Sequence, residues 1–318
     1  MYLKQACNSS SYWNNFLKLC LGIIIIFSLA VIFQLPWFYA VIQKISSLND
    51  ISFKNAQLIF ESMGSNDKMK ILDSNLNLLL YNIGFIGLLL GVILCSKINN
   101  VSFLKLTTSR SKIDIGRICF SFSITFCLSL IFLAVTIFTS PDGVLVNNFE
   151  FDRFFWLFLI AIIFIPIQTS AEEYLCRGYL MQSLGGLTKT RWFPLLLTSL
   201  LFAALHLANP EIEKYGYVVF VFYIGAAFFA GILTLMDEGL ELALGWHFAN
   251  NLFISLFITV ENSAMPTNAI LKDVSRASNN SFFDVIIPVF IIFPLMLFIF
   301  TKKYNWNWKK WKAKLISL

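Results

Sequence analysis

The stretch AEEYLCRGYL, residues 171–180, places two carboxylates and one arginine at the end of a long apolar run. Glu173 and Arg177 are four residues apart, in the order that favours an ion pair on one face of a helix. Glu172 is turned about 100° away on the same helix and has no cation three or four residues further on. The spacing therefore predicts a structural role for Glu173 and leaves Glu172 available for chemistry.

The only two histidines of the chain lie in later apolar runs. In LLFAALHL, Phe202 precedes His206 by four residues and can brace its ring. In LGWHFANN, His247 and Asn251 share one helix face, whereas Asn250 is turned about 100° away and is expected outside the site. A carboxylate beside an imidazole can activate water, and a second imidazole with a carboxamide can donate to a developing oxyanion. These side chains are suited to cleaving an amide bond within a membrane.

Each feature also has a purely structural explanation. A Glu–Arg pair can be a structural bridge, and a histidine or asparagine in a span can simply link two helices. The combination favours chemistry, because both histidines lie in spans that neighbour the Glu motif. A charge at mid-bilayer costs about 2.5–3.5 kcal/mol, so several such groups need one another or a water-filled cavity.

The composition is that of a membrane protein. Hydrophobic residues make up 58% of the 318 residues and charged residues 13%, against about 25% charged in a soluble domain. Runs of roughly spanning length predict an all-α integral membrane protein with about eight transmembrane helices. The runs are 19–43, 75–95, 115–139, 154–179, 193–209, 216–236, 241–260 and 285–301. The site would lie between the fourth, fifth and seventh.

Charge and cysteine usage narrow the class further. One alternating set of tails and loops holds 16 of the 24 Lys and Arg residues, which predicts a multi-pass cell-membrane protein with both termini in the cytoplasm. The net charge of +6 needs no nucleic acid to explain it, and the C-terminal YNWNWKKWKAK suits an anionic lipid surface. The six cysteines contain no C-x-x-C pair, which argues against a disulfide framework or a thiolate zinc site.

The three motifs together resemble the CAAX protease and bacteriocin-processing (CPBP, or Abi) family of intramembrane proteases. Its pattern of E-E-x-x-x-R, F-x-x-x-H and H-x-x-x-N recurs here in the same order, as Glu172-Glu173…Arg177, Phe202…His206 and His247…Asn251. The resemblance makes residues 151–260 the expected catalytic core. Residues 1–150 then contribute three spans without a motif, and residues 261–318 the last span and the basic Trp/Lys tail.

The resemblance implies a role for each site residue. The catalytic set is a water-activating pair, Glu172 and His206, and two residues that stabilise the oxyanion, His247 and Asn251; the structural support is Glu173, Arg177 and Phe202. The family is described both as zinc metalloproteases and as metal-independent glutamate proteases. If zinc is bound, its ligands are expected to be Glu172, His206 and His247. The sequence contains no H-E-x-x-H and leaves the cofactor open.

Two classes of function remain open. The first is an intramembrane endopeptidase acting on a membrane-associated peptide or protein, prenylated as in the eukaryotic branch or unprenylated as in bacterial peptide maturation and bacteriocin self-immunity. The second is a non-catalytic transporter or signalling modulator that retains the protease-like fold. A transporter is expected to show repeat symmetry and broken helices, and the sequence shows neither. The sequence also leaves the oligomeric state open.

The expected depths of the site residues disagree. If the fourth span ends near residue 179, Glu172 and His247 each lie about seven residues, roughly 10 Å, from the cytoplasmic end of their spans. His206 lies about thirteen residues, roughly 20 Å, from the cytoplasmic end of the fifth span. Either the fifth span starts deeper, or the fourth is kinked at Pro166 or residues 168–170.

Overall fold

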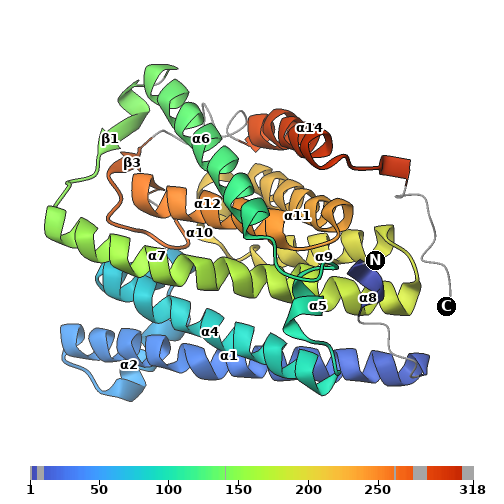
Figure 1. Cartoon of the computed structure of the whole chain (residues 1–318). Coiled ribbons are helices and arrows are strands. Elements are labelled where there is room, and N and C mark those ends of the chain that lie inside the picture. The colour runs from blue at the N-terminus through green and yellow to red at the C-terminus, as the bar shows by residue number, and fades with distance from the viewer. Residues whose placement is uncertain (1, 6–10, 140, 261–262, 275–284, 310–318) are drawn as a thin grey trace.

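The computed structural model describes residues 2–5, 11–139, 141–260, 263–274 and 285–309, which form a bundle of long helices (Figure 1). The helices are α1 (Tyr12–Asn49), α2 (Phe53–Ser62), α3 (Ser65–Lys70), α4 (Ser74–Ile98), α5 (Phe103–Thr107), α6 (Ile115–Thr139), α7 (Phe151–Glu173), α8 (Met181–Thr188), α9 (Trp192–Leu205), α10 (Pro210–Tyr215), α11 (Val218–Asp237), α12 (Glu241–Phe257) and α14 (Phe293–Tyr304). Short 3-10 turns are η1 (Tyr2–Lys4) and η2 (Pro141–Gly143), and π-helical segments are η3 (Tyr174–Leu180) and η4 (Pro288–Ile292). Residues 310–318 of the basic tail lie outside the described residues.

The predicted all-α membrane architecture is confirmed. Six helices of the described chain are long and apolar enough to cross a membrane: Tyr12–Asn49, Ser74–Ile98, Ile115–Thr139, Phe151–Thr188, Val218–Asp237 and Val285–Tyr304. The other two predicted segments are the shorter helices α9, of 14 residues, and α12, of 17 residues. At 1.5 Å per residue α9 is only about 21 Å long, less than the apolar thickness of a bilayer. A site at its end is therefore kept away from both surfaces.

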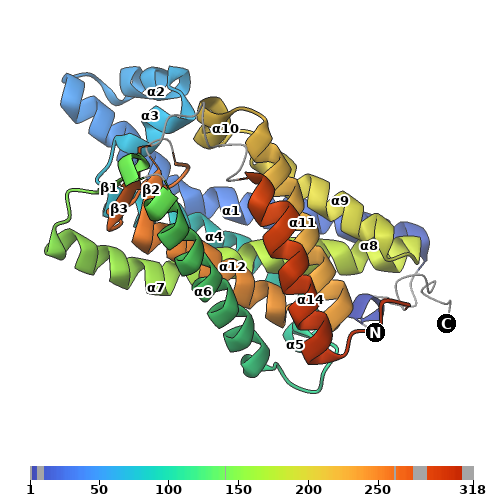
Figure 2. The same cartoon turned by 90° about the horizontal axis from the view of Figure 1, so that it is seen from above.

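The helices form layers that place the candidate site in the middle. Helices α1 and α4 pack together on one side, and α6 and α14 cross the opposite side (Figures 1 and 2). Between them lie α7, α9 and α12, which carry Glu172, Phe202 and His247, together with α11, which packs against α9 and α12. Close approach of these layers depends on glycine: a Cβ at Gly91 of α4 would lie 2.8 Å from the Ile26 Cα of α1, and a Cβ at Gly245 of α12 would lie 2.2 Å from the Ile118 carbonyl oxygen of α6.

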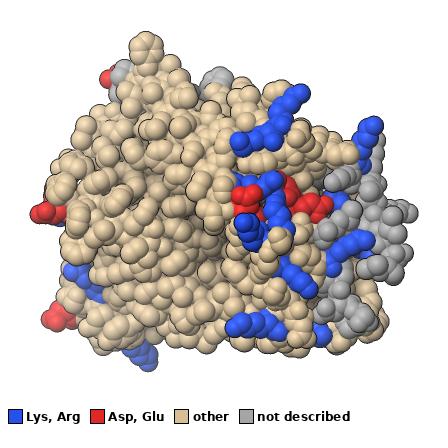
Figure 3. Space-filling model, viewed as in Figure 1, with Lys and Arg blue, Asp and Glu red and all other residues tan. Residues whose placement is uncertain are grey.

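The two ends of the bundle differ. Three short strands, β1 (Val144–Val146), β2 (Ile258–Val260) and β3 (Leu271–Asp273), form a small sheet at one end, with β3 antiparallel to β1 and parallel to β2. We call this the loop end. The opposite end, with η1, α5 and residues 305–309, is called the tail end (Figure 1). On the face shown in Figure 3, most charged side chains gather at the tail end.

The turn between α11 and α12 is fixed by ion pairs of two buried carboxylates, Asp237 and Glu241. Asp237 pairs with Arg117 and with Arg110, whose Nη2 lies 2.5 Å from Oδ2 of Asp237. Arg110 also pairs with Glu241, with 3.3 Å between Nη1 and Oε2, and Glu241 is fully buried. Because Glu241 lies six residues before His247 on α12, these contacts help to fix the depth of that histidine.

The fourth predicted span extends further than expected and does not break at Pro166. Helix α7 contains Pro166 and continues through η3 and α8 to Thr188 as one apolar segment of 38 residues. Neighbouring helices and local π-helical turns allow proline in such helices. Glu172 thus lies 16 residues before Thr188, or roughly 24 Å. The helix is thus not broken at Pro166 or at residues 168–170, and its greater length accounts for the mismatch in depth with His206.

The two ends of the bundle can be assigned to the two sides of the membrane by single cysteines in a cysteine-free background. We expect Ser109→Cys and Asn307→Cys, both exposed at the tail end, to be protected from an impermeant maleimide in intact cells. Val146→Cys, 69% exposed at the loop end, should be labelled. Labelling of positions 109 and 146 from the same side would contradict the eight-helix arrangement.

Candidate active site

The predicted Glu173–Arg177 ion pair is present and buried. Nη1 of Arg177 lies 2.9 Å from Oε1 of Glu173, and the two side chains are 1% and 0% exposed. Arg177 also donates from Nη2 to the Ala227 carbonyl at 3.0 Å, and its Cζ lies 4.6 Å from the centroid of the Phe202 ring. The guanidinium thereby joins the long helix of the Glu motif to α11 and α9.

His247 lies between the two carboxylates. Its Nδ1 is 2.8 Å from Oε1 of Glu173, the same oxygen that binds Arg177, and its Nε2 is 3.4 Å from Oε2 of Glu172. The Glu172 side chain is 15% exposed, whereas that of Glu173 is 0% exposed. The spacing argument assigned only Arg177 to Glu173, so it missed that this carboxylate also holds an imidazole.

These contacts fix which nitrogen of His247 is available. Paired with a guanidinium, Glu173 is a carboxylate and only accepts hydrogen bonds. Nδ1 of His247 must then carry the hydrogen. In the neutral ring, Nε2 of His247 carries a lone pair and accepts hydrogen bonds. In the imidazolium, Nε2 carries a hydrogen and is a second donor. In either form Nε2 faces Glu172. If Nε2 carries a lone pair, it and the carboxylate of Glu172 repel each other unless a proton or a water molecule lies between them.

His206 is held in a parallel way. It follows the last residue of α9, its Nδ1 lies 2.8 Å from the Phe202 carbonyl oxygen, and its ring packs 4.6 Å from that of Phe202 and 4.5 Å from that of Tyr223. A carbonyl oxygen only accepts hydrogen bonds, so Nδ1 of His206 is the donor. In neutral His206, Nε2 then carries a lone pair and can accept a hydrogen bond. The predicted bracing by Phe202 is present, whereas the contact with Tyr223 was not foreseen.

The structure brings the motifs together with a different pairing from the one predicted. Glu172 contacts His247, and no hydrogen bond or ion pair joins it to His206 within the described residues. Phe202 lies against both imidazoles, with its ring centroid 4.6 Å from that of His206 and 6.1 Å from that of His247. The predicted catalytic roles of these side chains stay predictions.

Asn251 follows His247 by one turn of α12, as predicted. Its Oδ1 accepts a hydrogen bond from Nδ2 of Asn250 at 3.0 Å. With the oxygen engaged, Asn251 presents its two amide hydrogens as donors. Asn250, which was expected outside the site, thus orients the amide of Asn251.

A zinc site of the three candidate ligands is only partly assembled. Nε2 of His247 and Oε2 of Glu172 lie 3.4 Å apart, and an Nδ1–H donated to a carboxylate is the usual support of a zinc-binding histidine. However, no three His, Cys, Asp or Glu side chains of the described chain lie close enough to hold a metal ion together. We therefore derive no catalytic step through a metal.

Glu211, on α10 beyond His206, was missed by the sequence analysis. Its Oε1 accepts from the Ala264 amide at 2.8 Å, and its Oε2 is buried without a partner in the described chain. Burial raises the pKa of the Glu211 carboxyl, and the Ala264 amide and nearby His206 oppose that rise. The sequence offered only a weak signal, an acid five residues after His206 in a polar turn.

Comparison with known proteins fits this site. Residues 151–253 match the family model of type II CAAX prenyl endopeptidase Rce1-like proteins. The chain is also 34% identical over 214 residues to the uncharacterized protein YyaK of Bacillus subtilis (strain 168), covering 67% of this chain and 69% of that protein. The chain belongs to the Rce1-like, or CPBP, family. No solved structure matches it significantly.

Family membership identifies the protein as a multi-pass membrane protein of the endopeptidase kind. The matched region contains all seven predicted site residues: Glu172, Glu173, Arg177, Phe202, His206, His247 and Asn251. The resemblance read from the motifs is thus confirmed at the level of the family.

Removal of the Glu173 carboxylate is expected to destabilise the protein strongly. Glu173→Ala leaves Arg177 buried without its counter-ion and His247 without its acceptor, and losing one partner of a buried pair costs about 3–5 kcal/mol. The free energy of unfolding, measured with denaturant in detergent micelles, should fall by about that amount.

Glu150→Ala is the matched control, because the Glu150–Arg153 pair is 59% and 57% exposed and such pairs contribute about 0–1 kcal/mol. Equal losses in the two variants would contradict a structural role for Glu173.

Proposed function

We propose that the protein is an intramembrane endopeptidase that hydrolyses a peptide bond of a membrane-associated peptide or protein. The observation that carries the proposal is the position of His247 between two adjacent carboxylates. One carboxylate, Glu173, fixes its Nδ1, and the other, Glu172, faces its Nε2. A histidine held only for structure needs one such partner, whereas this one has a second, partly exposed carboxylate at its free nitrogen.

Glu172 is the proposed base. It is the less buried of the two acids and forms no ion pair with an Arg or Lys side chain of the described residues, so it can take a proton from water as the oxygen attacks the carbonyl carbon of the substrate. The same carboxyl can then return that proton to the leaving amine. We assign His206 Nε2 to orienting the water, because its Nδ1 is held by the Phe202 carbonyl.

The oxyanion formed by this attack needs donors. Asn251 can donate from Nδ2, since its Oδ1 is held by Asn250. His247 can donate from Nε2 only as imidazolium, because Nδ1–H is already directed at Glu173. The zinc-ligand role requires the opposite form, with a lone pair on Nε2. The two roles predicted for His247 thus differ by a single proton.

The surroundings of the site favour an extended substrate. The reacting groups lie between helices, with Glu172 15% exposed and His247 7% exposed at the side chain. A folded domain cannot reach them, whereas an unfolded segment or a lipid-anchored peptide end can. Prenylated and unprenylated peptides are therefore both candidate substrates.

Replacement of the base is expected to abolish most activity without unfolding the protein. Glu172→Gln keeps the shape but cannot take a proton, so turnover should fall by about 10²–10⁴, while the melting temperature changes little. The measurement is cleavage of quenched fluorescent peptides, with and without a prenyl group, by protein in liposomes.

Glu61→Gln, an exposed carboxylate on α2, is the control and should cleave like the wild type. If Glu172→Gln cleaved at the wild-type rate, the proposed base would be wrong; if the wild type cleaved no peptide, a non-catalytic function would be favoured. On the same wild-type protein, loss of activity with a chelator and its return with zinc would support the ligand role of His247, and no effect would support the donor role.

The oxyanion role is tested on α12. Loss of one preorganised donor costs about 10²–10³ in turnover, so Asn251→Ala should lower kcat by that factor with little change in KM. Asn250→Ala should have a smaller effect, because it only orients the amide of Asn251.

Ser255→Ala, one turn further along α12, serves as the control for this helix, because within the described residues the hydroxyl of Ser255 donates only to the backbone oxygen of Asn251. Wild-type kcat in Asn251→Ala would exclude Asn251 from the oxyanion site.

A further inference from the structure

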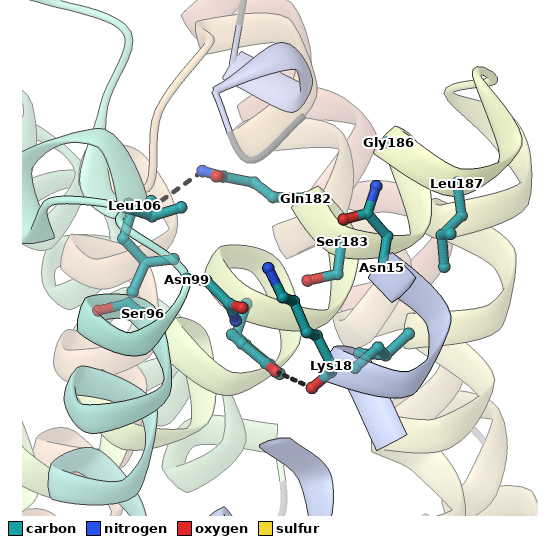
Figure 4. A pocket seen from close by; sticks show the side chains of 12 residues that line it. Asn15, Lys18, Ser96, Asn99, Leu106, Gln182, Ser183, Gly186 and Leu187 are labelled. Carbon is teal, nitrogen blue, oxygen red and sulfur yellow. Dashed lines mark hydrogen bonds between the residues drawn. The ribbon is translucent and has the colours of Figure 1, made fainter. Parts of the chain in front are cut away.

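A polar cavity lies at the tail end, apart from the site around Glu172. It has a volume of about 60 Å³ and opens between the first turns of α1, the end of α4 and helix α8 (Figure 4). Its polar lining consists of Asn15, Lys18, Ser96, Asn99, Tyr179, Gln182 and Ser183. A buried water needs about 10–15 Å³, so the cavity has room for a few polar atoms and is too small for a peptide.

Lys18 is the one charged residue of this lining. It is half-buried, and it forms no ion pair within the described chain. Figure 4 shows its ammonium directed into the cavity, with Asn99 on one side and Ser183 on the other. A partly desolvated cation without a counter-ion is unfavourable, so the cavity favours an anionic group.

Ser183 adds a second polar group. Its side chain lines the cavity beside the ammonium of Lys18 (Figure 4). A hydroxyl can donate a hydrogen bond to an anionic oxygen. The cavity thus fits an anionic group that pairs with Lys18 and accepts from Ser183.

The position of the cavity favours a lipid over a free ion. Five and six residues before Lys18, the aromatic side chains of Trp13 and Tyr12 are 70% and 58% exposed, as is typical of residues at a membrane interface. Leu17 and Leu21, beside Lys18 on α1, are 57% and 59% exposed. They offer an apolar surface for acyl chains next to the polar cavity.

We propose that this cavity binds the headgroup of an anionic phospholipid from the leaflet at the tail end. Lys18 pairs with the phosphate, and Ser183 donates a hydrogen bond to it. This binding is independent of the proposed peptidase activity.

The test is retention of lipid by the purified full-length protein. Native mass spectrometry should show one phosphatidylglycerol retained in preference to phosphatidylcholine, and phosphatidylglycerol should raise the melting temperature more than phosphatidylcholine does. In Lys18→Gln the apparent affinity for phosphatidylglycerol should fall by about fivefold, the contribution of one lysine near a lipid phosphate.

Lys97→Gln is the matched control, because Lys97 is exposed at the same end and lies outside the cavity lining. It should retain the lipid like the wild type. Ser183→Ala provides a second variant in case Lys18→Gln does not fold, and it should also weaken retention. Equal retention in the Lys18, Ser183 and Lys97 variants would overturn the proposal. Saturation of the thermal shift by inorganic phosphate alone would overturn the lipid source.

Discussion

A single buried oxygen atom, Oε1 of Glu173, accepts hydrogen bonds from both Arg177 and His247. In a low-dielectric interior such a carboxylate is tolerated only with its partners in place. Through Arg177 it binds the Ala227 carbonyl of α11 and the ring of Phe202 on α9, and through His247 it binds α12. Four helices are thus positioned by one side chain, and the orientation of the catalytic candidates follows from it.

The depth of the site depends on two features that lie outside the motifs. The helix of the Glu motif runs on through η3 and α8 to Thr188, which places Glu172 well away from its end. At the same time, α12 begins at the buried Glu241, which is held by Arg110. The deep end of the short helix α9 then brings His206 toward the same level. The charged residues at the tail end therefore help to fix the depth of the site, although none of them lies in it.

One long helix also links the two proposed sites. Glu172 lies on it at the proposed peptidase site, and Gln182 lies ten residues further on at the proposed lipid site. The hydroxyl of Tyr179, between them, donates to the backbone oxygen of Lys18 on α1 at 3.3 Å. The first of these sites lies in the region that the family model matches, whereas the second rests on the half-buried Lys18 and the polar lining around it.

The sequence by itself determined the membrane class, the helical segments, the family, and the i,i+4 pair of Glu173 and Arg177, because hydropathy and helical spacing are local properties. Only the tertiary structure decided that His247, rather than His206, contacts Glu172, because contacts between helices depend on their depth and rotation. Those depend in turn on an uninterrupted helix at Pro166 and on close packing at glycines, which no spacing rule supplies. Glu211 was missed for the same reason: its contact with the Ala264 amide, 53 residues further along the chain, is created by the fold.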